Sequence, residues 1–147
     1  MYGLNRFARS AFLATLVTAG LISLAAHSSL TFAEDVRVIL NGDQEVPPVQ
    51  TAAAGRGTIS VSADKTVAGS VTTTGVAGTM AHIHEGAPGQ NGGVAIPLEK
   101  SGDNTWSVPA GAKLTDAQYT SFKAGNLYVN VHSAQHKGGE IRGQLKP

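Results

Sequence analysis

From position 36 onward the chain is made of short runs in which apolar and polar residues alternate. Gly, Pro, Asn and Asp separate these runs at close intervals. An alternation of period two turns one side of each run toward a core and the other side away from it. The pattern therefore predicts an all-β domain, of the sandwich or barrel kind. The expected strands are 36–40, 58–62, 67–74, 80–84, 94–98, 105–108, 127–132 and 140–145.

The segment 127–132 shows the alternation most clearly. Its odd-numbered positions are all aliphatic, whereas its even-numbered positions are Tyr128, Asn130 and His132. A strand with one apolar and one polar side is typical of an antiparallel sheet that buries a single face. We therefore expect the polar face of this strand to lie outside the hydrophobic core.

One segment, 115–124, departs from the strand pattern and predicts a short helix. Thr115 and Gln118 have the spacing of a capping box, and Gly125 suits the end of the helix. The segment carries no group that resembles a reactive centre. We expect a short crossover helix with a structural role.

The beginning of the chain has the features of an export signal. Arg6 and Arg9 precede an uncharged apolar stretch at 11–26, and small residues follow it. The sequence therefore predicts a secretory signal peptide at 1–33 and one domain at 34–147, which places the protein in the periplasm or outside the cell. An uncleaved signal that anchors the chain in the membrane is the alternative.

Composition narrows the possible functions. The chain has 11 basic and 10 acidic side chains, a formal net charge of +1 and no cysteine. No run of like charge is present, so nucleic acid and anionic membrane surfaces are not expected partners. Without cysteine there is no disulfide, no thiolate catalysis and no blue-copper site. Motifs for a serine nucleophile, a phosphate-binding loop and a calcium loop are also missing.

Histidine provides the candidate chemistry. Four of the five histidines form two clusters, His82 with His84 and His132 with His136, while His27 lies in the predicted signal. A His-x-His pair on a strand places both imidazoles on one face. His132 and His136 need a bend between them before both can reach one ion. The alternatives are that His132 binds while His136 is a loop residue, or that all four are structural.

Four imidazoles would complete a tetrahedral or tetragonal shell, which predicts a metal site. Copper is the first expectation and zinc the second, because divalent affinity for nitrogen ligands is highest for Cu(II). Met80 has the same strand phase as His82, and its thioether would favour Cu(I), unless it fills the core. Glu85 has the opposite phase and is expected at the surface, although it could support a ligand or act as an acid or base.

Several of these segments resemble the CHRD domain, a module named after repeats in the developmental protein chordin and also found in bacterial exported proteins. The similar segments span most of the predicted domain: QEVPP at 44–48, AHIHEG at 81–86, LYVNVH at 127–132 and GEIRGQL at 139–145. The resemblance implies an antiparallel Greek-key β-sandwich, immunoglobulin-like or superoxide-dismutase-like. His82, His84 and His132 match histidine positions of the family, whereas His136 departs from its pattern.

A more local similarity links AHIHEG and Val131-His132 to the copper-ligand strands of copper-zinc superoxide dismutases. The chain lacks their zinc-binding loop and their disulfide cysteines. Three functions remain open at this stage. The first is an exported protein that binds copper for tolerance, storage or transfer. The second is an interaction module that binds another exported protein without metal. The third is a copper redox enzyme of the dismutase type.

Overall fold

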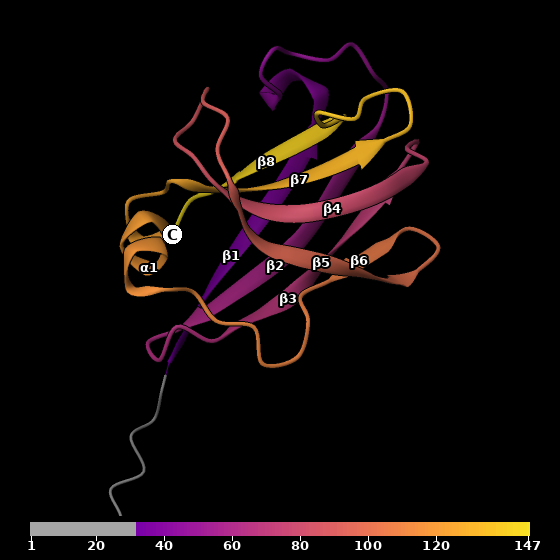
Figure 1. Ribbon diagram of the computed structural model, residues 1–147. Coiled ribbons are helices and arrows are strands. Elements are labelled where there is room, and N and C mark those ends of the chain that lie inside the picture. Colours follow the sequence, from indigo (N-terminus) through magenta and orange to yellow (C-terminus); the bar gives the residue numbers. More distant parts are fainter. Residues whose placement is uncertain (1–31) are drawn as a thin grey trace, which may run out of the picture.

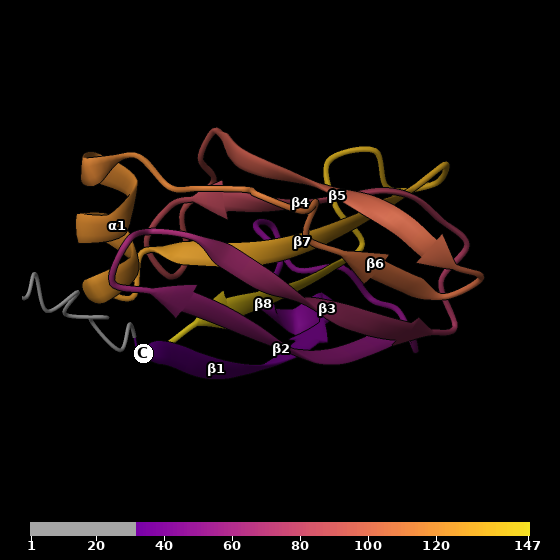
Figure 2. The same ribbon diagram turned by 90° about the horizontal axis from the view of Figure 1, so that it is seen from below.

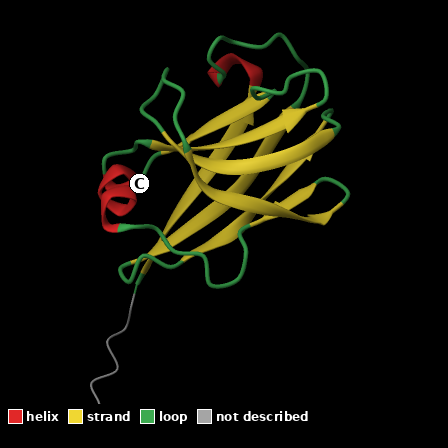
Figure 3. Cartoon of the chain, in the orientation of Figure 1, coloured by secondary structure: helices red, strands yellow, loops and turns green. Residues whose placement is uncertain are grey.

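The computed structural model describes residues 32–147, so His27 and positions 1–31 of the predicted signal peptide lie outside the described residues. Within this range the chain is all-β with one short helix, as the alternation predicts (Figure 3). The strands are β1 (Ala33–Asn41), β2 (Ala54–Ser62), β3 (Val67–Thr74), β4 (Gly78–Glu85), β5 (Val94–Gly102), β6 (Thr105–Ser107), β7 (Leu127–Ser133) and β8 (Ile141–Leu145). The helical elements are the 3-10 turn η1 (Gly42–Gln44) and the helix α1 (Asp116–Lys123).

The strands form a closed antiparallel barrel in the order β1-β2-β3-β6-β5-β4-β7-β8. A pairing of Asn41 with Arg142 joins β1 to β8 and closes the barrel. Figure 2 shows β4, β5 and β7 on one side and β1, β2 and β3 on the other. The Greek-key sandwich implied by the family resemblance stays unconfirmed, because the ladders continue around one barrel instead of separating into two sheets.

The barrel interior is filled by the inward-facing aliphatic residues of the strands. Val129 of β7, Ile59 of β2 and Leu40 of β1 are fully buried, and Trp106 of β6 adds an indole to the same core. Each large side chain of this kind contributes roughly 1.5–3 kcal/mol when it is fully removed from water. In the absence of disulfides, this packing is the main source of stability.

Helix α1 lies at one end of the barrel (Figure 1). The predicted capping box is present: Thr115 accepts a hydrogen bond from the backbone of Gln118, whose side chain accepts one from the backbone of Thr115. Phe122 is completely buried and anchors the helix to the barrel core. No helix within residues 32–147 is long and apolar enough to cross a membrane.

Strand β7 has the expected apolar and polar faces, but it is not half-buried as expected, because all seven of its residues are buried. Its inner face packs into the core, and its outer, polar face is covered by three loops. These are the segment after β1 (42–53), the β4–β5 loop (86–93) and the β7–β8 loop (134–140). Hydrogen bonds from Asn91 to the carbonyl of Val46 and from Gly92 to the hydroxyl of Tyr128 hold two of the loops in place. The barrel therefore has a second, polar layer outside β4, β7 and β8.

Candidate metal centre

Three of the four predicted ligands meet in this polar layer. His82 and His84 extend from the outer face of β4, and His132 from the outer face of the neighbouring β7. One ring nitrogen from each lies within 4.8 Å of those offered by the other two. Within the part of the chain that the structure describes, these three histidines form a group of side chains close enough together to hold one metal ion. A bond length of about 2.0–2.1 Å to each nitrogen corresponds to nitrogens roughly 3–4 Å apart, so a modest contraction brings all three onto one ion.

Backbone carbonyls fix the orientation of two of these rings. The Nδ1 atom of His84 lies 3.0 Å from the carbonyl oxygen of Gly92, and the Nδ1 atom of His132 lies 2.9 Å from that of Lys137. A carbonyl only accepts, so Nδ1 carries the proton in each ring. The Nε2 atoms then keep their lone pairs, which is the tautomer that a metal requires.

His82 completes the arrangement through the opposite ring nitrogen. Its Nδ1 atom lies 3.0 Å from Nε2 of His132. Because Nε2 of His132 is unprotonated, Nδ1 of His82 donates this hydrogen bond in the metal-free state. Moving that proton to Nε2 of the half-buried His82 ring would give the centre a third lone pair.

One ligand atom is left without any partner in the protein. The Nε2 atom of His84 is buried and makes no hydrogen bond. A buried polar atom without a partner is unfavourable by roughly 1–3 kcal/mol, and most such atoms in proteins are satisfied. A metal ion among the three rings would satisfy this nitrogen.

The electrostatic setting keeps the imidazoles neutral. Burial is the main cause that lowers the pKa of His82, His84 and His132 below the usual 6.5. Mutual repulsion between the rings lowers the pKa of His82 and His84 further. Neutral imidazole is the form that binds a metal, so the centre is prepared for binding at neutral pH.

A stack of three side chains forms one wall of the site. Tyr128 lies parallel to His84, with ring centroids 5.0 Å apart and planes inclined by 9°. From the β8 side, the guanidinium carbon of Arg142 lies 3.5 Å from the centre of the Tyr128 ring. Strand β7 separates β4 from β8, so the tyrosine is enclosed by the histidine and the arginine. This packing restricts rotation of the His84 ring.

Arg142 also holds the loop that orients His84. It is 1% exposed, and its guanidinium donates hydrogen bonds to the carbonyl oxygens of Gln90 and Ala87 in the β4–β5 loop and to the side-chain oxygen of Gln144. The same loop supplies the Gly92 carbonyl that accepts from His84. Arg142 is thus a positioning residue for the centre.

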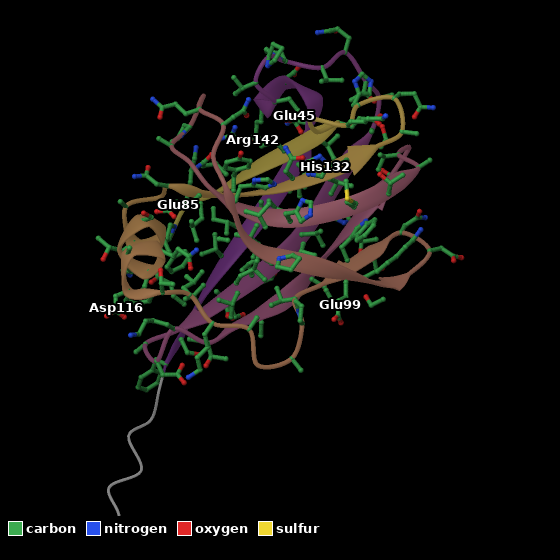
Figure 4. The ribbon with its side chains drawn as sticks, in the orientation of Figure 1. Glu45, Glu85, Glu99, Asp116, His132 and Arg142 are labelled. Carbon is green, nitrogen blue, oxygen red and sulfur yellow. The ribbon has the colours of Figure 1, made fainter. Side chains whose placement is uncertain are left out.

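A buried carboxyl group lies next to this arginine. Glu45 is 4% exposed, and both of its oxygens accept hydrogen bonds from the side-chain amide of Asn130, at 2.9 and 3.0 Å. Burial raises the pKa of Glu45 to about 7, although Asn130 and the charge of Arg142 act in the opposite direction. Figure 4 shows Glu45 above Arg142 and His132, on the outer side of β7 and β8.

The remaining candidates lie elsewhere. His136 is outside the three-histidine group; its backbone carbonyl accepts hydrogen bonds from Ser133 and Gly139 and shapes the β7–β8 loop. Glu85 turns toward α1 and accepts a hydrogen bond from Ser121, so it does not reach the imidazoles (Figure 4). Met80 is 49% exposed, which excludes the core-filling role considered for it.

Sequence reasoning missed Glu45, Tyr128 and Arg142 as parts of the site. The only signals were indirect: Tyr128 shares the strand phase of His132, and Glu45 and Arg142 belong to segments that resemble the CHRD family. Nothing in the spacing of Glu45 and Arg142 shows that they meet, because 96 positions separate them. Closure of the barrel brings them together.

Fold and site together define an all-β barrel domain with a histidine cluster under its outer loops. A family model described as the CHRD domain matches residues 36–145, and the chain belongs to this family. CHRD domains are interaction-type β modules that occur in extracellular proteins. A search of curated proteins and a search of solved structures each found no match.

Proposed function

We propose that the protein is an exported metal-binding protein that holds one copper ion through His82, His84 and His132. The unpartnered Nε2 atom of His84 carries this proposal. It is buried, it belongs to a ring whose other nitrogen is fixed by Gly92, and it lies beside two further imidazoles. A purely structural histidine would have partners for both nitrogens or expose the free one to water.

The donor set favours copper over the other metals. Three neutral imidazoles with no nearby carboxylate ligand suit copper and zinc and do not suit magnesium or calcium. Glu85 accepts a hydrogen bond from Ser121 and Glu45 accepts from Asn130, and neither belongs to the histidine group. Copper lies at the top of the divalent affinity order, so it is the expected ion and zinc is the second choice.

Each surrounding residue has a defined task in this proposal. Gly92 and Lys137 set the tautomers of His84 and His132 through their carbonyls. Tyr128 limits the rotation of His84, and Arg142 holds the loop that contains Gly92. A bound copper ion would supply Lewis acidity and one-electron chemistry on the outer face of β4 and β7. The proposed role is copper tolerance, storage or transfer outside the cytoplasm.

The test is a titration of the protein with Cu(II) and with Zn(II), compared with the double variant His82→Ala/His84→Ala. We expect one-to-one binding that the double variant loses. His136→Ala is the matched control, since it removes a histidine from the same layer but not from the cluster, and it should bind as tightly as the unmodified protein. Equal binding by all three proteins, or none, would refute the site and favour an interaction module without metal.

Loss of binding in His136→Ala as well would instead add His136 as a fourth ligand, as the count of four imidazoles first suggested. Circular dichroism of each variant shows whether the barrel is intact. A redox enzyme of the dismutase type is a separate hypothesis, which requires superoxide-dependent turnover by the copper-loaded protein. Binding without turnover would restrict the function to storage or transfer.

A further inference from the structure

Met80 lies beside the histidine centre. On β4 it is two residues before His82, so both side chains extend from the outer face of the strand, about 6.5–7 Å apart at the backbone. On β7 its direct partner in the ladder is His132. Side chains opposite one another in an antiparallel pair have Cβ atoms about 4.5–5.5 Å apart. Met80 thus neighbours two of the three proposed ligands, one along its own strand and one across the ladder.

The two ends of the centre differ in accessibility. At the His84 end, Tyr128 stacks on the imidazole and closes the site. At the other end, His82 is half-buried and Met80 is 49% exposed. Single apolar residues are common on protein surfaces, so exposure alone does not distinguish Met80. The position of Met80 in the ladder distinguishes it, because Met80 lies at the open end of the cluster of imidazoles.

A methionine in this place has the right chemistry for one oxidation state of the metal. Its side chain is flexible, and its thioether is a soft ligand that favours Cu(I) over Cu(II) and Zn(II). No packing in the core holds Met80 away from the ring nitrogens. Three imidazoles leave one position of a tetrahedral shell free on the open side.

We infer that Met80 is a fourth ligand that makes the centre selective for soft monovalent ions, Cu(I) and Ag(I). This inference rests on the proposed three-histidine site. The ion enters from the open end, where the thioether meets it first, and it then binds the imidazoles of His82, His84 and His132. Cu(II) and Zn(II) bind through the histidines alone.

The experiment measures affinities of the full chain and of Met80→Leu for Cu(I), Ag(I), Cu(II) and Zn(II). Competition with a coloured chelator under anaerobic, reducing conditions gives the Cu(I) value. Leucine keeps the size and the apolar character and removes only the sulfur. We expect Met80→Leu to bind Cu(I) and Ag(I) at least about ten-fold more weakly, and to bind Cu(II) and Zn(II) within about three-fold of the unmodified protein. Val94→Leu is the matched control, because it changes an exposed apolar residue that pairs with His84 from β5. Its affinity for each of the four ions should equal that of the unmodified protein.

A direct spectroscopic reading completes the test. The chain has two methionines, so addition of Ag(I) to protein labelled at the methionine methyl groups should shift one resonance, the one missing from Met80→Leu. Unchanged Cu(I) and Ag(I) affinity in Met80→Leu, or an unshifted Met80 methyl signal, would overturn the inference while the histidine site stands. Absence of binding of every metal to the unmodified protein would overturn the proposed function and the inference with it.

Discussion

The buried carboxyl of Glu45 predicts an unusual dependence of stability on pH. The native state keeps this proton up to about pH 7, whereas an ordinary glutamate loses it near 4.5. Between these values the native state binds more protons than the unfolded chain, so the free energy of unfolding falls as the pH rises. With about 1.4 kcal/mol for each pKa unit, Glu45 contributes a loss of roughly 2.5 kcal/mol between about pH 5 and about pH 8.

The perturbation that isolates this effect is Glu45→Gln. Glutamine has nearly the same shape, and its oxygen can accept from the Asn130 amide as the carboxyl does. Its NH₂ group can also donate to the Oδ1 atom of Asn130, which is buried and has no partner. The glutamine side chain cannot ionise, so the variant should lack the loss of stability between about pH 5 and about pH 8 that Glu45 causes. We expect it to be more stable than the unmodified protein at about pH 8 and similar at about pH 5.

Urea unfolding of both proteins, with EDTA present to remove metals, measures the difference. Trp106 is the single tryptophan and is 4% exposed, so its fluorescence reports unfolding. The lowered pKa values of the three histidines change the stability of both proteins in the same way and cancel in the comparison. Stability curves that stay parallel, with a difference that changes by less than about 0.5 kcal/mol across this range, would refute a raised pKa for Glu45.

Three further predictions concern the centre and its support. Metal affinity should begin to weaken at a lower pH than it would with ordinary imidazoles of pKa 6.5, because burial lowers the pKa of His82, His84 and His132 and keeps their rings neutral. A decline that begins near pH 8 in zinc titrations would contradict this. Arg142→Met should destabilise the barrel by about 3 kcal/mol, since it leaves the carbonyls of Ala87 and Gln90 without a donor, and urea unfolding tests it. Gly139→Ala should destabilise the protein by more than about 2 kcal/mol, because φ is +133° and a Cβ would lie 2.5 Å from the Asn130 side-chain amide. Gly138→Ala is the control: its Cβ would meet nothing within 4 Å, so it should have little effect in the same assay.

Much of the fold could be predicted because it depends on local patterns. Alternation identified every strand, and the capping residues Thr115 and Gln118 identified α1. Strand ends were less accurate: β2 begins at Ala54 rather than at 58, since small residues there give no alternation. Barrel closure was not predictable, because the pairing of Asn41 with Arg142 depends on the twist of the whole sheet.

For the site too, local features could be predicted from the sequence and long-range features could not. His82 and His84 belong to one strand, so their common face followed from a period of two. Their proximity to His132 requires β4 and β7 to be neighbours, which the ladder between the two strands shows. Burial of the outer face of β7 was not expected, because it comes from loops that have no periodicity. The roles of Glu45 and Arg142 depend on these loops and stayed hidden for the same reason.

The carbonyls that orient His84 and His132 have a consequence for how the protein tolerates mutation. Both acceptors are backbone oxygens, which every residue type has, so the two hydrogen bonds do not require a particular side chain. Lys137 is exposed, and any residue that leaves the loop path unchanged keeps its carbonyl on His132. Gly92 is constrained, since a Cβ there would lie 1.5 Å from the carbonyl of Glu85. The orientation of the ligand rings therefore depends on the length of these loops more than on the side chains in them. A one-residue insertion or deletion in 134–140 would disturb the centre more than most point substitutions in that loop.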